Sequence, residues 1–352
     1  MLTTRGVRSH SLWRWPLLAV VAVTCVMLPG CGGKTAGAPS AGPITLYNGQ
    51  HPETTDSLVA AFEKATGIKV DIRNGDEDVL ANQIVEEGKS SPADVIYTEN
   101  SQALQFLETK NLLAPVPGST LAKVPSRYNS PTGDWVGVSA RVSVIVYNTK
   151  LLAAGQLPTS VLDLAEPKWS GKLGLAPSET DFQPIITSVV HSYGQAEALR
   201  WLEALKKNAA SHTYPDNETL TAAVNNGQVA IGIINHYYWY RLRYEIGNSS
   251  MHSRIAYFAP RDPGYVIDVS GAGVLRSSHH KPGAEKFLAF LVSKAGQEII
   301  AHSQSYEYPL GSGVVTAQPL RPFSQLQPTP LTIAQLGDGA TAVALLHEAQ
   351  LL

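Results

Sequence analysis

The sequence contains only two cysteines, Cys25 and Cys31, and both lie near its N-terminus. Residues 32–352 therefore have no cysteine with which to form a disulfide bond or a thiolate metal site. Exported proteins often use disulfides for stability, so the folded part of this chain must depend on its hydrophobic core instead.

Charged residues are also few, at 16% of the chain, and the formal net charge is only −2. Nucleic-acid-binding domains usually carry a concentrated excess of Lys and Arg, and this composition gives no indication of a nucleic-acid partner. The hydrophobic content of 44% is typical of a soluble globular protein. At 352 residues, the chain is long enough for two domains.

The apolar segment at residues 15–27 is too short for a comfortable transmembrane helix. It follows a basic segment with three arginines, which is typical of a signal peptide. The residues Leu28-Pro29-Gly30-Cys31 resemble the lipobox of bacterial lipoproteins, in which the cysteine becomes the lipidated first residue of the mature chain. We therefore expect a lipoprotein signal peptide over residues 1–30 and lipidation of Cys31. The alternative is an ordinary signal peptide with a chance cysteine.

Residues 31–43 are rich in Gly, Ala, Ser and Pro, which predicts a flexible tether between the membrane and the folded chain. We find no internal repeat and no other low-complexity segment. The sequence also lacks a nucleophile elbow, a phosphate-binding loop of the Gly-Lys-Ser type and a His-Glu-x-x-His motif. Several common classes of enzyme are thereby disfavoured.

The pattern of apolar residues predicts an α/β fold. Residues 44–48, 68–72 and 93–97 have the character of strands, and two helical segments separate them. The first helix is predicted to begin at Pro52 and to end at Gly67, since proline is favoured at first helical positions and glycine at helix ends. A β-α-β-α-β order indicates a parallel sheet with helices on both faces.

Two long strand-like segments, residues 135–147 and 266–274, are expected to pass between two lobes. We predict a first α/β lobe over residues 44–143, completed by about 268–318. The second lobe is predicted over residues 144–267, completed by about 319–352.

Two adjacent tyrosines, Tyr237 and Tyr238, follow a buried strand predicted at residues 229–234 and precede a helix that ends at Gly247. Ligands of open α/β sheets bind at such strand ends. A helix N-terminus favours negative charge, so the phenols there are expected to ionise more easily. Phenolates are hard oxygen donors that suit a highly charged cation. The alternative is that this aromatic cluster belongs to the core.

Two further donor side chains, His51 and Glu99, also follow predicted strands. With Tyr237 and Tyr238 they supply one imidazole, one carboxylate and two phenolates. The three anions carry a charge of −3, which balances a trivalent ion.

Several short sequence motifs are individually weak signals but together are specific for one protein family. They are YNGQH at 47–51, PADV at 92–95, YTE at 97–99, VLD at 161–163, PKWSGK at 167–172, YYWY at 237–240 and DPG at 262–264. In this order the chain resembles the ferric-iron-binding proteins of bacterial ABC transporters, the bacterial transferrins, over essentially all of residues 44–352.

The resemblance implies a two-lobe periplasmic-binding-protein fold of type II, with two crossing hinge strands and a ligand cleft between the lobes. It implies an extracytoplasmic receptor that delivers Fe³⁺ to an ABC transporter permease, and not an enzyme. With the predicted lipid anchor, the protein would lie at the cell membrane, on its periplasmic side or at the cell surface. A monomer is expected.

Carried over residue by residue, the iron ligands of that family fall on His51, Glu99, Tyr237 and Tyr238. The family completes the coordination with a synergistic anion. The candidate anion-binding residues here are Arg141, Thr180, Asn217 and Asn235.

The chain departs from the resemblance at Glu179-Thr180-Asp181, where phosphate-binding members have a small Ser-Gly-Ala-type turn. Two carboxylates would repel a bound phosphate. We therefore expect either a carbonate-type anion on Arg141 or Asp181 itself as an extra ligand. The alternative is that Glu179 and Asp181 complement the dipole of the helix that follows Phe182.

Two other functions remain open at this point. A related two-lobe receptor could bind an organic ligand such as a polyamine, thiamine or a sugar, although such sites do not need the His/Glu/Tyr/Tyr set. An iron-dependent surface enzyme would need open coordination positions and a nearby acid or base.

Overall fold

The computed structural model of the chain describes residues 43–311 and 313–352. The predicted signal peptide, the lipidation of Cys31 and nearly all of the predicted tether lie outside these residues. Within the described part of the chain, no helix is long and apolar enough to cross a membrane.

The N-terminal region alternates strands and helices as predicted. Its elements are β1 (Ile44–Gly49), α1 (Pro52–Thr66), β2 (Val70–Asn74), α2 (Glu77–Glu87), β3 (Val95–Thr98) and α3 (Ser101–Thr109). Strand β1 pairs in parallel with both β2 and β3, which confirms the predicted parallel sheet. Helix α1 has Pro52 in its first turn, and Gly67 closes it in the left-handed conformation (φ 73°), as the sequence predicted.

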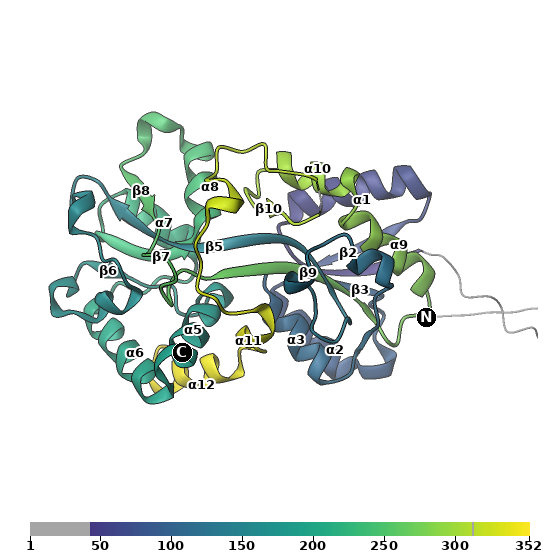
Figure 1. Cartoon of the computed structure of the whole chain (residues 1–352), viewed down its shortest axis with the longest axis horizontal. Coiled ribbons are helices and arrows are strands. Elements are labelled where there is room, and N and C mark those ends of the chain that lie inside the picture. The colour runs from purple at the N-terminus through teal and green to yellow at the C-terminus, as the bar shows by residue number, and fades with distance from the viewer. Residues whose placement is uncertain (1–42, 312) are drawn as a thin grey trace, which may run out of the picture. The chain divides into compact units, whose positions relative to one another are not determined.

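The strand β5 (Val136–Asn148) is buried along its whole length and belongs to two sheets in succession. Residues 136–142 pair with β9 (Ile267–Leu275), and β9 in turn pairs with β3. Residues 143–148 pair instead with β7 (Ile231–Asn235) and β8 (Ser253–Ala256). One strand thus joins two groups of elements, which we call the first and second lobes, and Figure 1 shows β5 and β9 side by side between them.

The second lobe is built around β7. Next to β7 lie β6 (Leu173–Gly174), α7 (Asn217–Asn225) and α8 (His236–Ile246), while α6 (Gln195–Ala209) packs on β6 and α5 (Gln183–Tyr193) packs on α6. The remaining helices and strands are β4 (Leu113–Ala114), α4 (Gly118–Leu121), α9 (Lys281–Leu291), α10 (Lys294–His302), β10 (Tyr308–Pro309), α11 (Ile333–Leu336) and α12 (Ala340–Glu348).

The C-terminal segment returns to the second lobe. Figure 1 shows it in yellow, crossing in front of β5 and β9 after β10. Two backbone hydrogen bonds fix it there, from Arg261 to the Gln327 carbonyl and from Thr329 to the Tyr265 carbonyl. Helix α12 then packs on α5 and α6.

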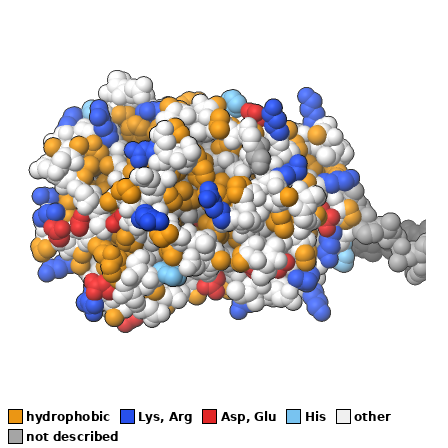
Figure 2. Space-filling model, in the orientation of Figure 1, with side chains coloured by type: hydrophobic (Ala, Val, Ile, Leu, Met, Phe, Trp, Pro, Cys, Tyr) orange, Lys and Arg blue, Asp and Glu red, His pale blue; other side chains and the backbone are white. Residues whose placement is uncertain are grey.

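The face of the molecule shown in Figure 2 carries scattered charge. On the face shown in Figure 2, Lys and Arg side chains are dispersed among Asp and Glu side chains and do not form one large basic patch. Hydrophobic side chains are visible between them, most densely around the middle of this face. Charge of one sign is concentrated instead in a cavity between the lobes, which is described below.

Candidate metal centre

The ends of three strands bring the predicted donor residues together. His51 lies between β1 and α1, and Glu99 follows β3 directly. Tyr237 and Tyr238 lie in the first turn of α8, immediately after β7. The first lobe therefore supplies an imidazole and a carboxylate, while the second lobe supplies two phenols.

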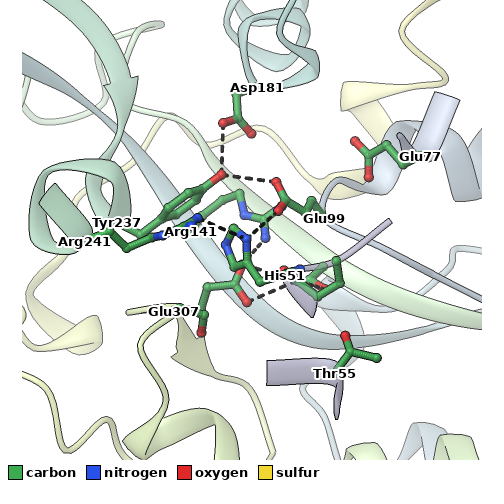
Figure 3. Close-up of polar contacts among 12 residues, drawn as sticks. His51, Thr55, Glu77, Glu99, Arg141, Asp181, Tyr237, Arg241 and Glu307 are labelled. Atoms are coloured by element: carbon green, nitrogen blue, oxygen red, sulfur yellow. Dashed lines mark hydrogen bonds and ion pairs between the residues drawn. The ribbon is translucent and has the colours of Figure 1, made fainter. Parts of the chain in front are cut away.

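The side chains of His51, Glu99 and Tyr237 are in contact, as Figure 3 shows. The Nδ1 atom of His51 lies 2.9 Å from Glu99 Oε1. The Tyr237 hydroxyl donates to Glu99 Oε2 at 3.2 Å, and the Tyr237 and Tyr238 rings are 4.2 Å apart. The predicted ligand set is thus one cluster that spans both lobes.

One ring nitrogen of the cluster has no partner. His51 is only 7% exposed, and its Nε2 atom is buried without a hydrogen-bond partner in the described part of the chain. Burying an unpaired polar atom usually costs about 1–3 kcal/mol. A metal ion bound at Nε2 would satisfy it, while Nδ1 remains fixed by Glu99.

Asp181 faces the phenols and is held from several sides. Its Oδ2 atom accepts from the Tyr237 hydroxyl at 3.1 Å, and Tyr238 also hydrogen-bonds it. The amides of Asn100 and Asn217 lie 3.1 and 3.4 Å from its oxygens. A protein carboxylate therefore lies directly against both phenols.

The other predicted anion-binding residues differ in their positions. Thr180 accepts a hydrogen bond of 3.0 Å from Asn100 across the lobes. Asn235 is buried just before α8, but no described hydrogen bond joins its side chain to the cluster.

Glu179 hydrogen-bonds the start of a helix. Its carboxylate accepts from the backbone N–H of Asn217 at 3.1 Å, at the start of α7. Glu179 also precedes the short turn Thr180–Phe182 that leads into α5, where its side chain forms no capping hydrogen bond. That Glu179 and Asp181 complement the dipole of α5 stays a prediction.

Arg141 is fully buried beneath the phenols, with its guanidinium 5.6 Å from the Tyr237 ring centre. It forms an ion pair with Glu307 and donates to Asn100 Oδ1 at 3.1 Å. Glu307 also accepts from Ser139 and Gln50. Glu307, which precedes β10, is distant from Arg141 in sequence and was not predicted as part of the site. Its charge already balances the arginine that was expected to hold an anion.

The expectation that the phenols ionise easily is wrong for the metal-free site. Burial, followed by the charge of Asp181, raises the pKa of Tyr237 and of Tyr238 well above the usual value. These effects outweigh the helix N-terminus. The pKa of Glu99 is shifted in the opposite direction. Burial alone would raise its pKa, but His51 and Arg141 outweigh burial and lower it to about 2.

Three more residues of the site could not be recognised from local sequence. Asn100 links the lobes, since its side-chain amide reaches Glu77, Thr180 and Asp181. Arg241, one turn after Tyr237, lies 3.3 Å from His51 Nδ1. His236 is fully buried and hydrogen-bonds the Tyr306 carbonyl at 2.8 Å.

The chemistry of the cluster depends on tyrosine. Among the described residues, no group of three or more His, Cys, Asp or Glu side chains is arranged to hold a metal ion. With the phenols included, the cluster offers one nitrogen and up to four anionic oxygen-donor groups, from Glu99, Asp181, Tyr237 and Tyr238. Hard anionic oxygens favour a small, highly charged cation over soft or monovalent ions.

A family model described as bacterial extracellular solute-binding protein matches residues 48–298. The Fe(3+)-binding periplasmic protein of Serratia marcescens is 40% identical over 333 residues, which cover 95% of this chain and 97% of that protein.

Solved structures are also similar to this chain. The structure of iron-bound HitA from Pseudomonas aeruginosa has a TM-score of 0.83 and 43% identity, covering 87% of this chain and 98% of that chain. A Trichodesmium protein (IdiA, FutA) in complex with iron and citrate ligands has a TM-score of 0.77 and 31% identity, covering 88% and 99% of the two chains.

Proposed function

This chain belongs to the bacterial extracellular solute-binding proteins, among the ferric-iron-binding periplasmic proteins, and we propose that it captures Fe³⁺ between its lobes and delivers it to an ABC transporter permease. The observation that carries this function is the contact cluster of His51, Glu99, Tyr237 and Tyr238, with its unpaired buried ring nitrogen. An organic ligand or a catalytic reaction would not require two buried phenols beside two carboxylates.

The proposed binding reaction exchanges protons for iron. The raised pKa values of the phenols keep them protonated in the metal-free site. Fe³⁺ then displaces both phenol protons, and its charge replaces them in the buried site. Iron binding therefore weakens in acid, and the donor set does not strongly exclude other hard trivalent ions.

We further propose that Asp181 provides a carboxylate ligand to the iron in place of an external anion. Asn100 and Asn217 hold it against the phenols, and Arg141 is already paired with Glu307. Fe³⁺ with Glu99 and two phenolates is neutral, so a divalent phosphate would add uncompensated buried charge. If an external anion coordinates the iron in place of Asp181, a carbonate-type anion near Arg141 and Thr180 is therefore favoured over phosphate.

The function is tested by adding a ferric salt to the purified protein and scanning the visible absorbance. We expect a charge-transfer band from phenolate to iron, at one iron per chain. Absence of colour after ferric loading would contradict the proposal and favour an organic ligand. Substrate turnover by the loaded protein would favour a surface enzyme.

Iron should also hold the lobes together. We assign residues 44–143 and about 268–318 to the first lobe, and residues 144–267 and about 319–352 to the second. Since the donors come from both lobes, closure follows from their coordination of one ion. Small-angle scattering is expected to show a more compact protein after iron loading. The His51→Ala/Glu99→Ala variant should compact less, and equal compaction would contradict bridging of the lobes.

We propose that the protein acts as a monomer anchored to the membrane through lipid on Cys31. Mass spectrometry of protein from the membrane fraction should then show a lipidated N-terminal cysteine. The Cys31→Ser variant should move to the soluble fraction, whereas Cys25→Ser, which changes only the signal peptide, should not. A soluble wild-type chain with another, unmodified N-terminus would exclude this anchor.

A further inference from the structure

A cavity of about 690 Å³ lies beside His51 and Tyr238, and both lobes line it. This volume is much larger than an ion and its immediate donor atoms require. The cavity wall includes six acidic residues: Asp76, Glu77, Asp78, Glu99, Glu179 and Asp216. None of the described residues that line it is Lys or Arg.

The acidic wall keeps a negative charge even after allowance for burial. Burial raises the pKa of Glu77 well above its usual value and that of Glu179 to about 8. The negative charge of the wall at neutral pH is therefore attributed to the other four acidic side chains. Asp76 is exposed, and Asp216 is partly exposed. Asp78 is also partly exposed; burial raises its pKa, and the hydrogen bond from Gln183 opposes that shift. These three aspartates, together with Glu99, give the cavity negative charge along the approach to the metal centre.

A second observation indicates that a cation can bind at the acidic cavity wall. His51 lines the same cavity, and its buried Nε2 atom has no hydrogen-bond partner among the described residues. The acidic cavity therefore leads to a donor atom that is free to bind. A cation that entered it would move from attraction by the aspartates to coordination by His51 and the phenols.

Among the described residues, the cavity wall has no Lys or Arg side chain that could bind the free carboxylates of a chelator. Arg141 lies beneath the phenols and is paired with Glu307, while Arg241 is not part of the cavity wall. Next to the phenols, the space is occupied by the carboxylate of Asp181. A polycarboxylate in this cavity would meet like charges on several sides and no counter-charge.

We propose that this cleft accepts iron from cationic or neutral ferric species, and retains no polycarboxylate chelator beside the bound ion. The inference rests on the proposed ferric-iron function and specifies the form of the substrate. When iron arrives as a polycarboxylate complex, the bonds from iron to chelator break as the bonds to the protein form. The chelator leaves as an anion, and the phenol protons pass to solvent or to the departing chelator.

The proposal is tested by following the growth of the charge-transfer band after mixing apo-protein with one of two iron donors. The donors are ferric citrate, which is anionic, and the neutral tris-maltolate complex. Electrostatic steering changes association rates by about 10-fold or more, so we expect slower transfer from citrate by at least about 10-fold at low salt. Added salt should reduce this difference, because it screens the repulsion.

Variants of the cavity wall separate charge from other effects. Asp76→Asn/Asp78→Asn/Asp216→Asn removes three charges but keeps an N-cap side chain at position 216, where Asp216 caps α7. It should accelerate transfer from citrate several-fold and leave transfer from maltolate nearly unchanged. The control Asp71→Asn/Glu203→Gln/Glu348→Gln changes the net charge equally at positions that do not line the cavity. It should alter neither rate.

Radiolabelled citrate gives an independent readout. Protein loaded from labelled ferric citrate and then desalted should carry iron without label. One citrate per iron, or equal effects of the two triple variants, would overturn the inference while the colour still supports ferric binding. Absence of colour with both donors would instead contradict the proposed function itself.

Discussion

Replacing Tyr237 or Tyr238 by phenylalanine is expected to abolish or strongly bleach the ferric colour and to weaken iron binding by more than about 100-fold. Loss of groups that merely support a ligand typically costs 10–100-fold in metal affinity, and loss of a ligand should exceed that. Each phenol also supplies one of the negative charges that balance Fe³⁺. Absorbance titration with ferric ion against a competing chelator measures both effects.

The fold should tolerate these changes, because each variant keeps the aromatic ring that packs in the site. Tyr237 packs edge-on against His51 at 5.1 Å, and this contact needs no hydroxyl. Tyr240→Phe is a matched control on the same helix, since Tyr240 stacks on Tyr306 outside the donor cluster. Full colour in either the Tyr237 or the Tyr238 variant would remove that residue from the metal site.

Replacing Asp181 by alanine is expected to make tight iron binding depend on an added anion. Two opposite unit charges 4 Å apart interact by about 4 kcal/mol at an effective dielectric constant of 20, so iron affinity in anion-free buffer should fall at least about 100-fold. Bicarbonate should restore most of it, since the vacated space adjoins Asn100 and Asn217. Iron retention in bicarbonate, in phosphate and in neither measures this dependence.

The wild-type protein should hold iron in all three buffers. Glu179→Gln is the control, since burial raises the pKa of Glu179 to about 8 and leaves it largely uncharged at neutral pH. It should therefore retain iron without added anion. Tight binding supported by phosphate alone in the wild-type protein, unaffected by either Asp181→Ala or Arg141→Ala, would contradict our interpretation of residues 179–181.

Local sequence patterns were sufficient to predict the elements that carry the donors. Short strand-like segments predicted β1 and β3, and an uninterrupted apolar run predicted β7. Because ligands of such sheets bind beyond the ends of strands, His51, Glu99 and the two tyrosines could be grouped before any distance was known. The long buried run of β5 likewise predicted a strand shared by two lobes.

The electrostatics of the site could be decided only by the tertiary structure. The pairing of Arg141 with Glu307 joins residues 166 positions apart, and nothing near Glu307 in sequence marks it as a partner. Asn100 likewise reaches Asp181 from the other lobe. The pKa values of the phenols depend on burial and on Asp181, which overrode the effect expected from the helix N-terminus. Sequence determines which side chains end the strands. Their charge states depend on long-range contacts and on exclusion of water, which exist only in the folded chain.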